Sequence, residues 1–432
     1  MKFPGRRKSK HYFPVGEIGR PSFSPDIEDD RNVYIVGIEQ LLVDIEVDAD
    51  FGLLEHYGLN VGESCVLADD IVEEIYQKCV SEKLIIGEFA GGAVGNTLHN
   101  YSTLSDDRSV ALGTICENIE VGDYAFKYIC NTSSKVDFSY LQPHEGHMAR
   151  AICFVTPDRE RTFAIGKGIM NELCPEYIPE DVISNASALL LTAFLLRDQD
   201  SAMFQAAMKA VEYARNSGVS VVLALGTSSL IEGNQEFFYD FIKDNVDVLA
   251  MNGEEASALV GEEDPLLCAE KILDICDLTL LTVGKSGLYI CSWVDESNAR
   301  KTEDLLYSKS IPQYNKFEYS RGQKKEECSH PVKIYSHINP FMGGPIKIEN
   351  TNGAGDCALA ALLHDMSANM YHRQLVPNSP KHVGLYLTYS SIHQICKYAN
   401  RASYEVLKQR SPRLSHGLPD KEESLDNSYW SQ

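Results

Sequence analysis

The residues best suited to chemistry in this sequence are 353–356, Gly-Ala-Gly-Asp. Before them, Ile346 and Ile348 alternate with polar residues as in a short strand, and after them apolar residues recur at helical spacing through residues 359–370. A turn of small residues at the start of a helix lets a phosphoryl group approach unpaired backbone N–H groups. A carboxylate beside that group, here Asp356, is suited to act as a general base.

Two other interpretations fit the same turn. Glycines between a strand and a helix can serve the turn alone, without any ligand. Gly353, Gly355 and Ala358 also fit G-x-G-x-x-A, a dinucleotide-binding fingerprint that usually has an acidic residue about 20 positions later. No acid at the end of a strand follows here, because residues 371–383 have the pattern of a loop with two prolines.

Residues 350–356, Asn-Thr-Asn-Gly-Ala-Gly-Asp, resemble the D-T-x-G-A-G-D signature of the ribokinase-like (pfkB-type) sugar and nucleoside kinases. The resemblance extends over most of the chain. It implies an α/β fold with a doubly wound, mostly parallel sheet flanked by helices, and a small β lid that closes over the sugar. Asn350 stands where the family has its first Asp. If that acid only pins the turn through hydrogen bonds, an amide oxygen serves equally and restoring the acid should change turnover little.

The first hundred residues contain the groups expected to hold the substrate. A buried strand pattern ends just before Gln40 and Asp44, and α/β sheets bind ligands at the carboxyl ends of their strands. The resemblance implies that Asp44 holds two sugar hydroxyls, since one carboxylate can accept hydrogen bonds from both. Gly91, Gly92 and Asn96 resemble the family's G-G-x-x-x-N motif, which implies close approach of the backbone to the ribose and an amide for its hydroxyls. Taken alone, Asp44 is more simply a solvated loop acid and the glycine pair a structural turn.

Arg161 and Glu255 complete the expected reaction centre. Residues 147–165 have the pattern of a hairpin that resembles the family's lid, and Arg161 stands where the family often has a basic residue that reaches the transferred phosphate. Equally, Arg161 could be an arginine exposed on the hairpin, with no contact to the phosphate.

Asn252 and Glu255 resemble the N-x-x-E motif, whose Glu organises magnesium and its waters. Mg²⁺ does prefer oxygen ligands while keeping several waters. As a plain helix start the same segment would be unremarkable.

The resemblance also locates the expected ATP site. Thr282, Gly284 and Gly287 match the family's T-x-G-x-x-G nucleotide segment, and Asn252 is expected to contact ATP beside them. Asn400, in the last predicted helix, lies where the family closes over adenine. The sequence contains no G-x-x-x-x-G-K-[ST] motif, which excludes a P-loop enzyme.

The elements that must position these residues follow an α/β pattern. Beyond residue 179, strands and helices alternate, which predicts a mostly parallel sheet with helices on both faces. The predicted strands are 33–38, 109–112, 188–192, 219–225, 246–251 and 278–283. The predicted helices include 69–83, 201–216 and a last long helix over 386–409.

The predicted domain organisation is one large kinase domain with additions. Residues 1–31 form a basic N-terminal arm, and residues 32–432 form the kinase domain. Lid segments are expected near 44–62, 84–90 and 136–176. A long charged insertion covers 296–344, with a role that the sequence does not indicate, and a polar tail begins at residue 411.

Composition narrows the class of protein. The net charge of −23 argues against a nucleic-acid partner, which needs a basic face. The 12 cysteines form no C-x-x-C pair, so neither a zinc site nor a disulfide framework is predicted. The longest apolar run, 188–196, is too short to cross a bilayer, and no secretory leader pattern begins the sequence. These features predict a cytoplasmic enzyme that does not bind membranes.

Together the features predict a kinase that uses ATP and Mg²⁺ to phosphorylate the 5′-hydroxyl of a purine nucleoside, with inosine and guanosine implied by the whole-chain resemblance. Asp356 would take the hydroxyl proton, and the N–H groups of Gly353, Ala354 and Gly355 would hold the developing charge. An adenosine or sugar kinase of the same fold is the first alternative. A non-catalytic nucleotide-binding regulator is the second, although the presence of Asp356 beside the small-residue turn argues against it.

Three further expectations concern partners. The resemblance implies K⁺ as an activating ion, and a homodimer formed through the lid is a hypothesis. The basic arm could bind a regulatory purine nucleotide, because arginine suits phosphate, although a solvated arm is the simpler interpretation. Its basic residues are Lys2, Arg6, Arg7, Lys8 and Lys10.

Overall fold

A computed structural model describes residues 33–62, 64–158, 161–341 and 348–418. The predicted N-terminal arm and Ile346 lie outside these residues. Within them, no helix combines the length and the apolar character needed to cross a membrane.

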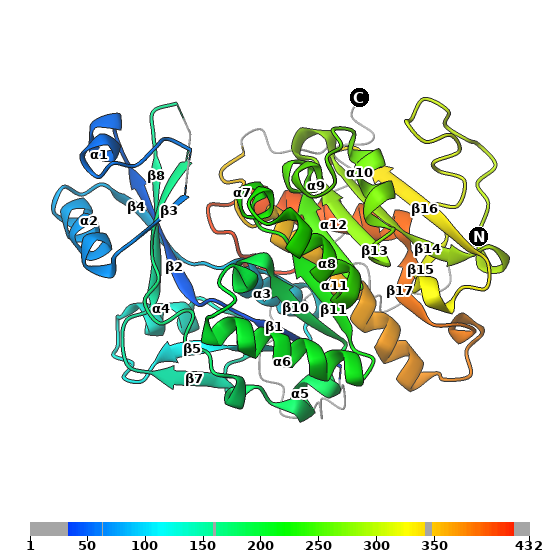
Figure 1. Cartoon of the computed structure of the whole chain (residues 1–432), viewed down its shortest axis with the longest axis horizontal. Coiled ribbons are helices and arrows are strands. Elements are labelled where there is room, and N and C mark those ends of the chain that lie inside the picture. The colour runs from blue at the N-terminus through cyan, green and yellow to red at the C-terminus, as the bar shows by residue number, and fades with distance from the viewer. Residues whose placement is uncertain (1–32, 63, 159–160, 342–347, 419–432) are drawn as a thin grey trace.

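A large sheet of 12 strands forms the body of the molecule (Figure 1). One half is parallel, and its neighbouring strands are β6 (Val136–Asp137), β5 (Ser109–Cys116), β1 (Ile35–Ile38), β10 (Ala188–Thr192), β11 (Ser220–Ala224), β12 (Val248–Asn252) and β13 (Leu278–Thr282). The other half is antiparallel and comprises β14 (Leu288–Asp295), β15 (Arg321–Gln323), β17 (Tyr386–Ser391) and, paired with β14, β16 (Pro331–Ile338). β7 (Leu141–His144) pairs with β5. The predicted mostly parallel α/β sheet is confirmed.

Helices cover both faces of this sheet. One face carries α5 (Glu180–Ser184), α6 (Ala202–Asn216), α7 (Ser228–Glu232), α8 (Gln235–Asn245), α9 (Gly253–Val260) and α10 (Pro265–Ile272). The other carries α3 (Ala93–Ser105), α4 (Tyr124–Cys130), α11 (Ala354–Leu375) and α12 (Ile392–Leu407). α6 shows why these segments are helical: apolar residues from Met203 to Ala214 recur on one face, and the Ser201 side chain caps the first turn by accepting from Phe204 N. Burying such faces against the sheet supplies the main stabilisation.

A second, five-stranded sheet stands beside the first (Figure 1). Its strand order is β3 (Ser64–Leu67), β9 (Arg161–Gly166), β8 (Ala149–Val155), β2 (Leu42–Asp48) and β4 (Ile85–Ala90). α1 (Phe51–His56) and α2 (Asp69–Ser81) pack on one face and enclose a separate small core. The predicted hairpin is the antiparallel pair β8–β9. β6 and β7, which fall inside the segment 136–176, pair with β5 of the large sheet.

Short 3-10 turns connect several elements. They are η1 (Pro175–Tyr177), η2 (Ala193–Leu196), η3 (Gly284–Ser286), η4 (Glu296–Asn298), η5 (Lys325–Glu327) and η6 (Pro380–His382).

Two secondary-structure predictions were wrong. The single helix over 386–409 is a strand, β17, followed by α12, because residues 386–391 pair with β15 and the Ser391 side chain then caps the helix. Ile348 is not in a strand, and its side chain is 55% exposed.

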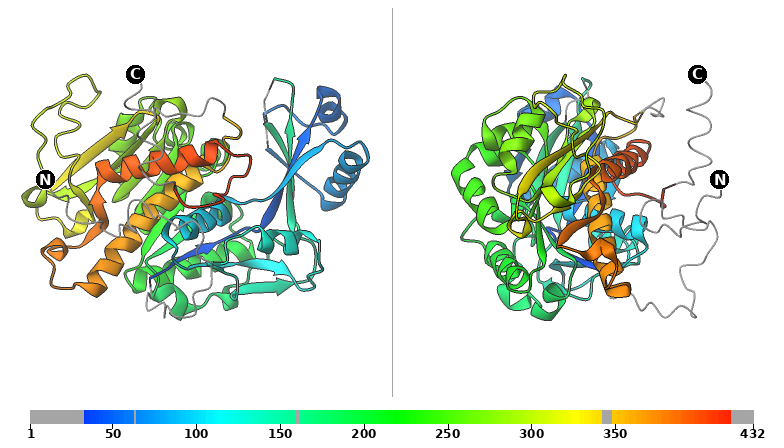
Figure 2. Two further views of the ribbon diagram at one scale, coloured as in Figure 1. Left: turned by 180° about the vertical axis from the view of Figure 1, so that it is seen from behind. Right: turned by 90° about the vertical axis from the view of Figure 1, so that its right-hand side faces the viewer.

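The insertion and the polar tail, whose roles the sequence does not indicate, contribute to the body. The long insertion supplies β15 and β16 to the antiparallel half of the sheet. Beyond α12 the chain turns back along the body, as seen from behind in Figure 2, and buries Arg413, Leu414 and Leu418. The part of the tail within the described residues is therefore packed against the domain.

Candidate active site

The first turn of α11 has the geometry expected of an anion site. Gly353, its N-cap, has a left-handed backbone with φ of 78°, and an added Cβ would lie 2.4 Å from the backbone oxygen of Pro412. Glycine is required there for both reasons. At Gly355 an added Cβ would meet nothing within 4 Å, so the space in front of the turn is open. Asp356 follows in the first turn and is partly exposed.

Asp356 is held by a chain of two hydrogen bonds. Asn96 Nδ2 on α3 donates to Asp356 Oδ2 at 3.0 Å, and Arg413 Nε donates to Asn96 Oδ1 at 3.0 Å. Desolvation raises the pKa of Asp356 to about 6, while the bond from Asn96 and the charge of Arg413 lower it. The structure thus brings together two sequence-predicted residues, Asn96 and Asp356, from opposite parts of the chain.

Two more carboxylates lie against the glycine pair before α3. A Cβ added at Gly91 would lie 2.5 Å from Asp44 Oδ2. A Cβ added at Gly92, where φ is 87°, would lie 1.8 Å from Glu39 Oε1. Any side chain at either position would displace a carboxylate. Burial raises the pKa of Asp44 to about 7 and that of Glu39 well above its usual value, while Arg413 lowers both. These glycines therefore make room for acids of the protein itself.

Arg413 is the functional candidate that sequence reasoning missed. Its side chain is 4% exposed. Besides the bond to Asn96, Nη1 donates to Thr132 Oγ1 at 2.6 Å, and Nη2 donates to Gly91 O at 3.2 Å and Tyr128 OH at 3.0 Å. A buried guanidinium with these partners is the cation that offsets three nearby carboxylates.

Backbone bonds to α3 hold Arg413 in place. Leu414 N donates to Asn100 Oδ1 at 2.7 Å, and His99 Nε2 lies 2.8 Å from Leu414 O. Burial and the charge of Arg413 lower the pKa of His99 to about 4, so its ring is neutral at pH 7. The sequence signal for this docking was limited to a few scattered leucines, Leu414 and Leu418 among them, in a mostly polar tail.

Arg161 joins the small sheet to the loop before α11. Its Nη2 donates to Asn350 Oδ1 at 3.0 Å and lies 3.4 Å from Glu46 Oε1. Asn350 Oδ1 also accepts from Asn352 N at 2.9 Å, while Asn350 Nδ2 donates to Arg410 O at 2.6 Å. The amide is used as acceptor and donor at once, and a carboxylate could not donate. This double use explains the departure from the family signature.

Glu255 begins α9 in a capping box with Asn252. Asn252 N and Nδ2 donate to its two carboxylate oxygens at 2.9 and 2.8 Å, and Glu255 N donates back to Asn252 Oδ1 at 2.9 Å. Burial raises the pKa of Glu255 to about 7, and the negative charge of Asp356 adds to the rise. Because both oxygens already accept hydrogen bonds, this carboxylate suits magnesium held through water better than direct ligation. Within the described residues no group of three His, Cys, Asp or Glu side chains forms a metal site.

The predicted ATP motifs meet at the ends of two neighbouring strands. Asn252 of β12 is the register partner of Thr282 of β13. Thr282 Oγ1 lies 3.4 Å from the backbone oxygen of Met251. Gly284 has φ of 47° and Gly287 has φ of 88°, so both adopt backbone conformations that favour glycine. This segment can approach a ligand closely only from the side away from β16, because an added Cβ at Gly287 would lie 1.9 Å from a β16 carbonyl.

Two other predicted residues bond to the protein itself. Gln40 Nε2 donates to Asn171 Oδ1 at 2.5 Å. Asn400, 9% exposed on α12, donates from Nδ2 to Asn339 O at 3.0 Å. Both side chains have a structural role that accounts for their positions.

Comparison with known proteins identifies the family. The profile of the pfkB family carbohydrate kinases matches residues 59–304. The sequence is 53% identical to "Guanosine-inosine kinase" of Escherichia coli (strain K12), over 100% of both chains. The chain belongs to the pfkB family of carbohydrate kinases.

Solved structures of the same fold agree with this membership. The adenosine kinase from Sinorhizobium meliloti matches with a TM-score of 0.66 at 20% identity, over 90% of this chain and 98% of that one. A probable sugar kinase from Rhizobium etli CFN 42 matches with a TM-score of 0.65 at 17% identity, over 89% and 96%. The predicted family and the predicted fold class are confirmed.

Proposed function

We infer that this pfkB family protein transfers the γ-phosphate of ATP to the 5′-hydroxyl of guanosine or inosine. The observation that carries this function is the 53% identity with a guanosine-inosine kinase along the full length of both chains. The site described above supports it, because an open anion-binding turn lies directly beside an acid that can accept a proton. The solved adenosine kinases share the fold at 20% identity or less, which gives adenosine no advantage as the acceptor.

We propose that Asp356 takes the proton of the 5′-hydroxyl. With a pKa of about 6 it is mostly ionised at neutral pH, and the bond from Asn96 fixes one of its oxygens. The N–H groups of Gly353, Ala354 and Gly355 belong to the start of α11 and would hold the charge that develops on the transferred phosphoryl group. Arg413 would keep this group of carboxylates ionised and aligned.

We propose that Asp44, at the small sheet, accepts hydrogen bonds from the ribose 2′- and 3′-hydroxyls. Its partial exposure leaves oxygen lone pairs free for a ligand. Arg161 is the proposed ligand of the transferred phosphate from the same sheet. Its Nη1 is buried and has no hydrogen-bond partner among the described residues, so that nitrogen remains to donate to a phosphate oxygen.

The proposed Mg²⁺ fits the chain through Glu255 and bound water. When present, the ion would neutralise charge on the ATP phosphates. Glu255 would contribute by holding the waters of the ion, which needs its ionised form. Four other features stay predictions: activation by K⁺, a homodimer through the small sheet, a cytoplasmic location, and contacts of ATP with Asn252, Thr282, Gly284, Gly287 and Asn400.

A nucleoside panel tests the function. The purified chain is incubated with ATP and Mg²⁺ and with guanosine, inosine, adenosine or ribose, and the 5′-monophosphate is quantified. We expect kcat/KM for guanosine and inosine to exceed that for adenosine at least tenfold. A preference for adenosine or ribose, or no phosphorylation of any of the four, would refute the proposal.

A further inference from the structure

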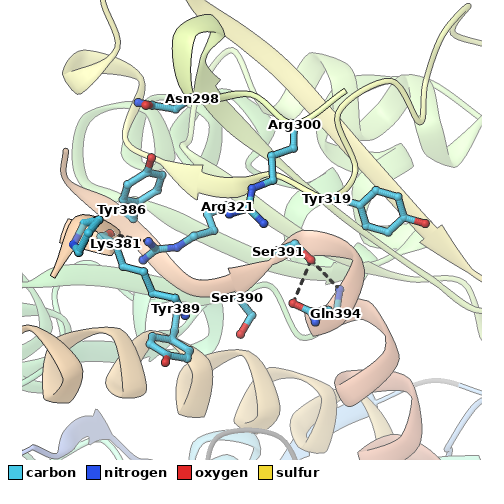
Figure 3. Close-up of a pocket in the computed structure, with 11 residues that line it drawn as sticks. Asn298, Arg300, Tyr319, Arg321, Lys381, Tyr386, Tyr389, Ser390, Ser391 and Gln394 are labelled. Carbon is cyan, nitrogen blue, oxygen red and sulfur yellow. Dashed lines mark hydrogen bonds between the residues drawn. The ribbon is translucent and has the colours of Figure 1, made fainter. Parts of the chain in front are cut away.

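A cavity of about 310 Å³ lies on the antiparallel side of the large sheet (Figure 3). It is bounded by the insertion, by η6 and by β17, the edge strand of the sheet. None of the active-site residues described above lines it. The proposed kinase activity therefore leaves this cavity unexplained.

The cavity is lined by positive charge. Arg300, Arg321 and Lys381 come from three different segments and lie around it, and no Asp or Glu is among the lining residues (Figure 3). This is unusual in a chain with 62 acidic and 39 basic residues. Arg300 and Lys381 are exposed, and neither side chain makes a hydrogen bond or ion pair with another described residue. Such unpaired cations around a concave surface favour an anionic ligand.

Arg321 is fixed in position by the protein. Its Nε donates to Thr388 O at 2.8 Å, Nη1 to Lys381 O at 2.6 Å, and Nη2 to Asn369 Oδ1 at 2.7 Å. A guanidinium has five N–H donors, so two remain for a ligand. Its guanidinium carbon lies over the ring of Tyr386, 4.0 Å from the ring centroid. A guanidinium held in this way loses little entropy when it binds an anion.

The walls also contain aromatic rings. Tyr386 and Tyr389 are half-buried, and Lys381 Nζ lies 4.0 Å from the ring centroid of Tyr389. Aromatic faces beside cations suit a ligand that combines a planar ring with a phosphate. The volume of the cavity lies at the lower end of the range for small-molecule sites.

We propose that this cavity is a second binding site, distinct from the reaction centre, for a purine nucleoside monophosphate.

Calorimetry with guanosine 5′-monophosphate tests the proposal. The full chain is first saturated with 5′-deoxyguanosine, which has no 5′-hydroxyl to phosphorylate and fills the nucleoside site of the reaction centre. ATP is left out, because its purine ring and phosphates would compete for the cavity. We expect the nucleotide to bind with one equivalent per chain. The double variant Arg300→Ala/Lys381→Ala should bind it at least tenfold more weakly and keep wild-type turnover, which verifies folding.

The matched control is Lys209→Ala/Arg215→Ala on α6, which changes the net charge equally and should bind like wild type. Guanosine and inorganic phosphate are titrated separately, and both should bind at least tenfold more weakly than the nucleotide. The proposal is overturned if wild type shows no binding under these conditions, if the cavity variant binds within twofold of wild type, or if either fragment binds as tightly as the nucleotide.

Discussion

Arg413 offers the sharpest test of how the reaction centre works. Replacing it with Met removes a buried charge and the four hydrogen bonds it donates to Asn96, Thr132, Gly91 and Tyr128. Removing one partner from a buried charged group typically costs about 3–5 kcal/mol of stability. We therefore expect the free energy of unfolding of Arg413→Met, measured with urea, to fall by roughly that amount. Arg413→Lys keeps the charge and should lose less.

The second expected effect is on the pH dependence of kcat/KM. Arg413 lowers the pKa values of Asp356, Asp44 and Glu39, so its removal should move the acidic limb of the profile to higher pH. With the Asp356 pKa at about 6, a rise of one unit lowers the ionised fraction at pH 7 only from roughly nine-tenths to roughly one-half. At pH 5 the same rise lowers that fraction almost tenfold, so the assay is most sensitive there.

Lys408→Met is the matched control, since this lysine lies near Arg413 in sequence but is 43% exposed, pairs with Glu405 and lies over the ring of Tyr404. It should change stability by no more than about 0.5 kcal/mol and leave the pH profile unchanged. If Arg413→Met unfolds in the buffer, Arg413→Lys provides the pH profile. An acidic limb at the wild-type pH in every folded Arg413 variant would show that the arginine does not control the carboxylates.

Four further predictions follow from the same geometry. Asp356→Asn should lower kcat by roughly 10² to 10⁴ with nucleoside affinity nearly unchanged, and turnover above a tenth of wild type would exclude Asp356 as the base. Asp44→Ala should raise the Kd for guanosine strongly, and equal affinity of wild type for guanosine and its 2′,3′-dideoxy analogue would contradict this role. Asn350→Asp loses the donor to Arg410 O, so its free energy of unfolding should fall by about 1–3 kcal/mol, and an unchanged urea midpoint would count against the double use of this amide. Asp44, Glu255 and Asp356 have raised pKa values, so the folded state binds more protons than the unfolded state between about pH 4 and 7. The free energy of unfolding of the ligand-free protein should therefore decrease as pH rises through that window. A free energy of unfolding that increases there would refute the assignment.

The sequence was informative where the signal is local. The turn at residues 353–356 could be located because small residues before a helical repeat have one simple structural meaning, and the structure has α11 beginning at Ala354. The parallel strands were equally visible, since strands buried on both faces appear as continuous apolar runs. Resemblance assigned Asn96 to the ribose hydroxyls and Asp356 to the proton transfer, but the hydrogen bond between the two is visible only in the structure.

The sequence was uninformative where the partner is distant. Residues 386–391 become a strand because they pair with β15, a segment within an insertion that had no readable pattern of its own. Arg413 lies in a polar stretch, and its bond to Asn96 spans most of the chain. Glu39 follows a strand like many solvated acids, and only the backbone of Gly92 and the arrangement of α3 make it a buried one. Asn350 could be noticed as a departure, but its donor role depends on Arg410, which no spacing rule connects to it.

The position of Arg413 in the chain also has a consequence for biosynthesis. The residue follows its partner Asn96 by 317 positions, so two of the carboxylates that it offsets, Glu39 and Asp44, belong to segments made much earlier. During translation, β1, β2 and α3 can assemble long before their counter-charge exists, and Glu39 and Asp44 would then remain solvated or protonated. The reaction centre therefore acquires its final charge state only after Arg413 has been synthesised and the segment that carries it has docked on α3.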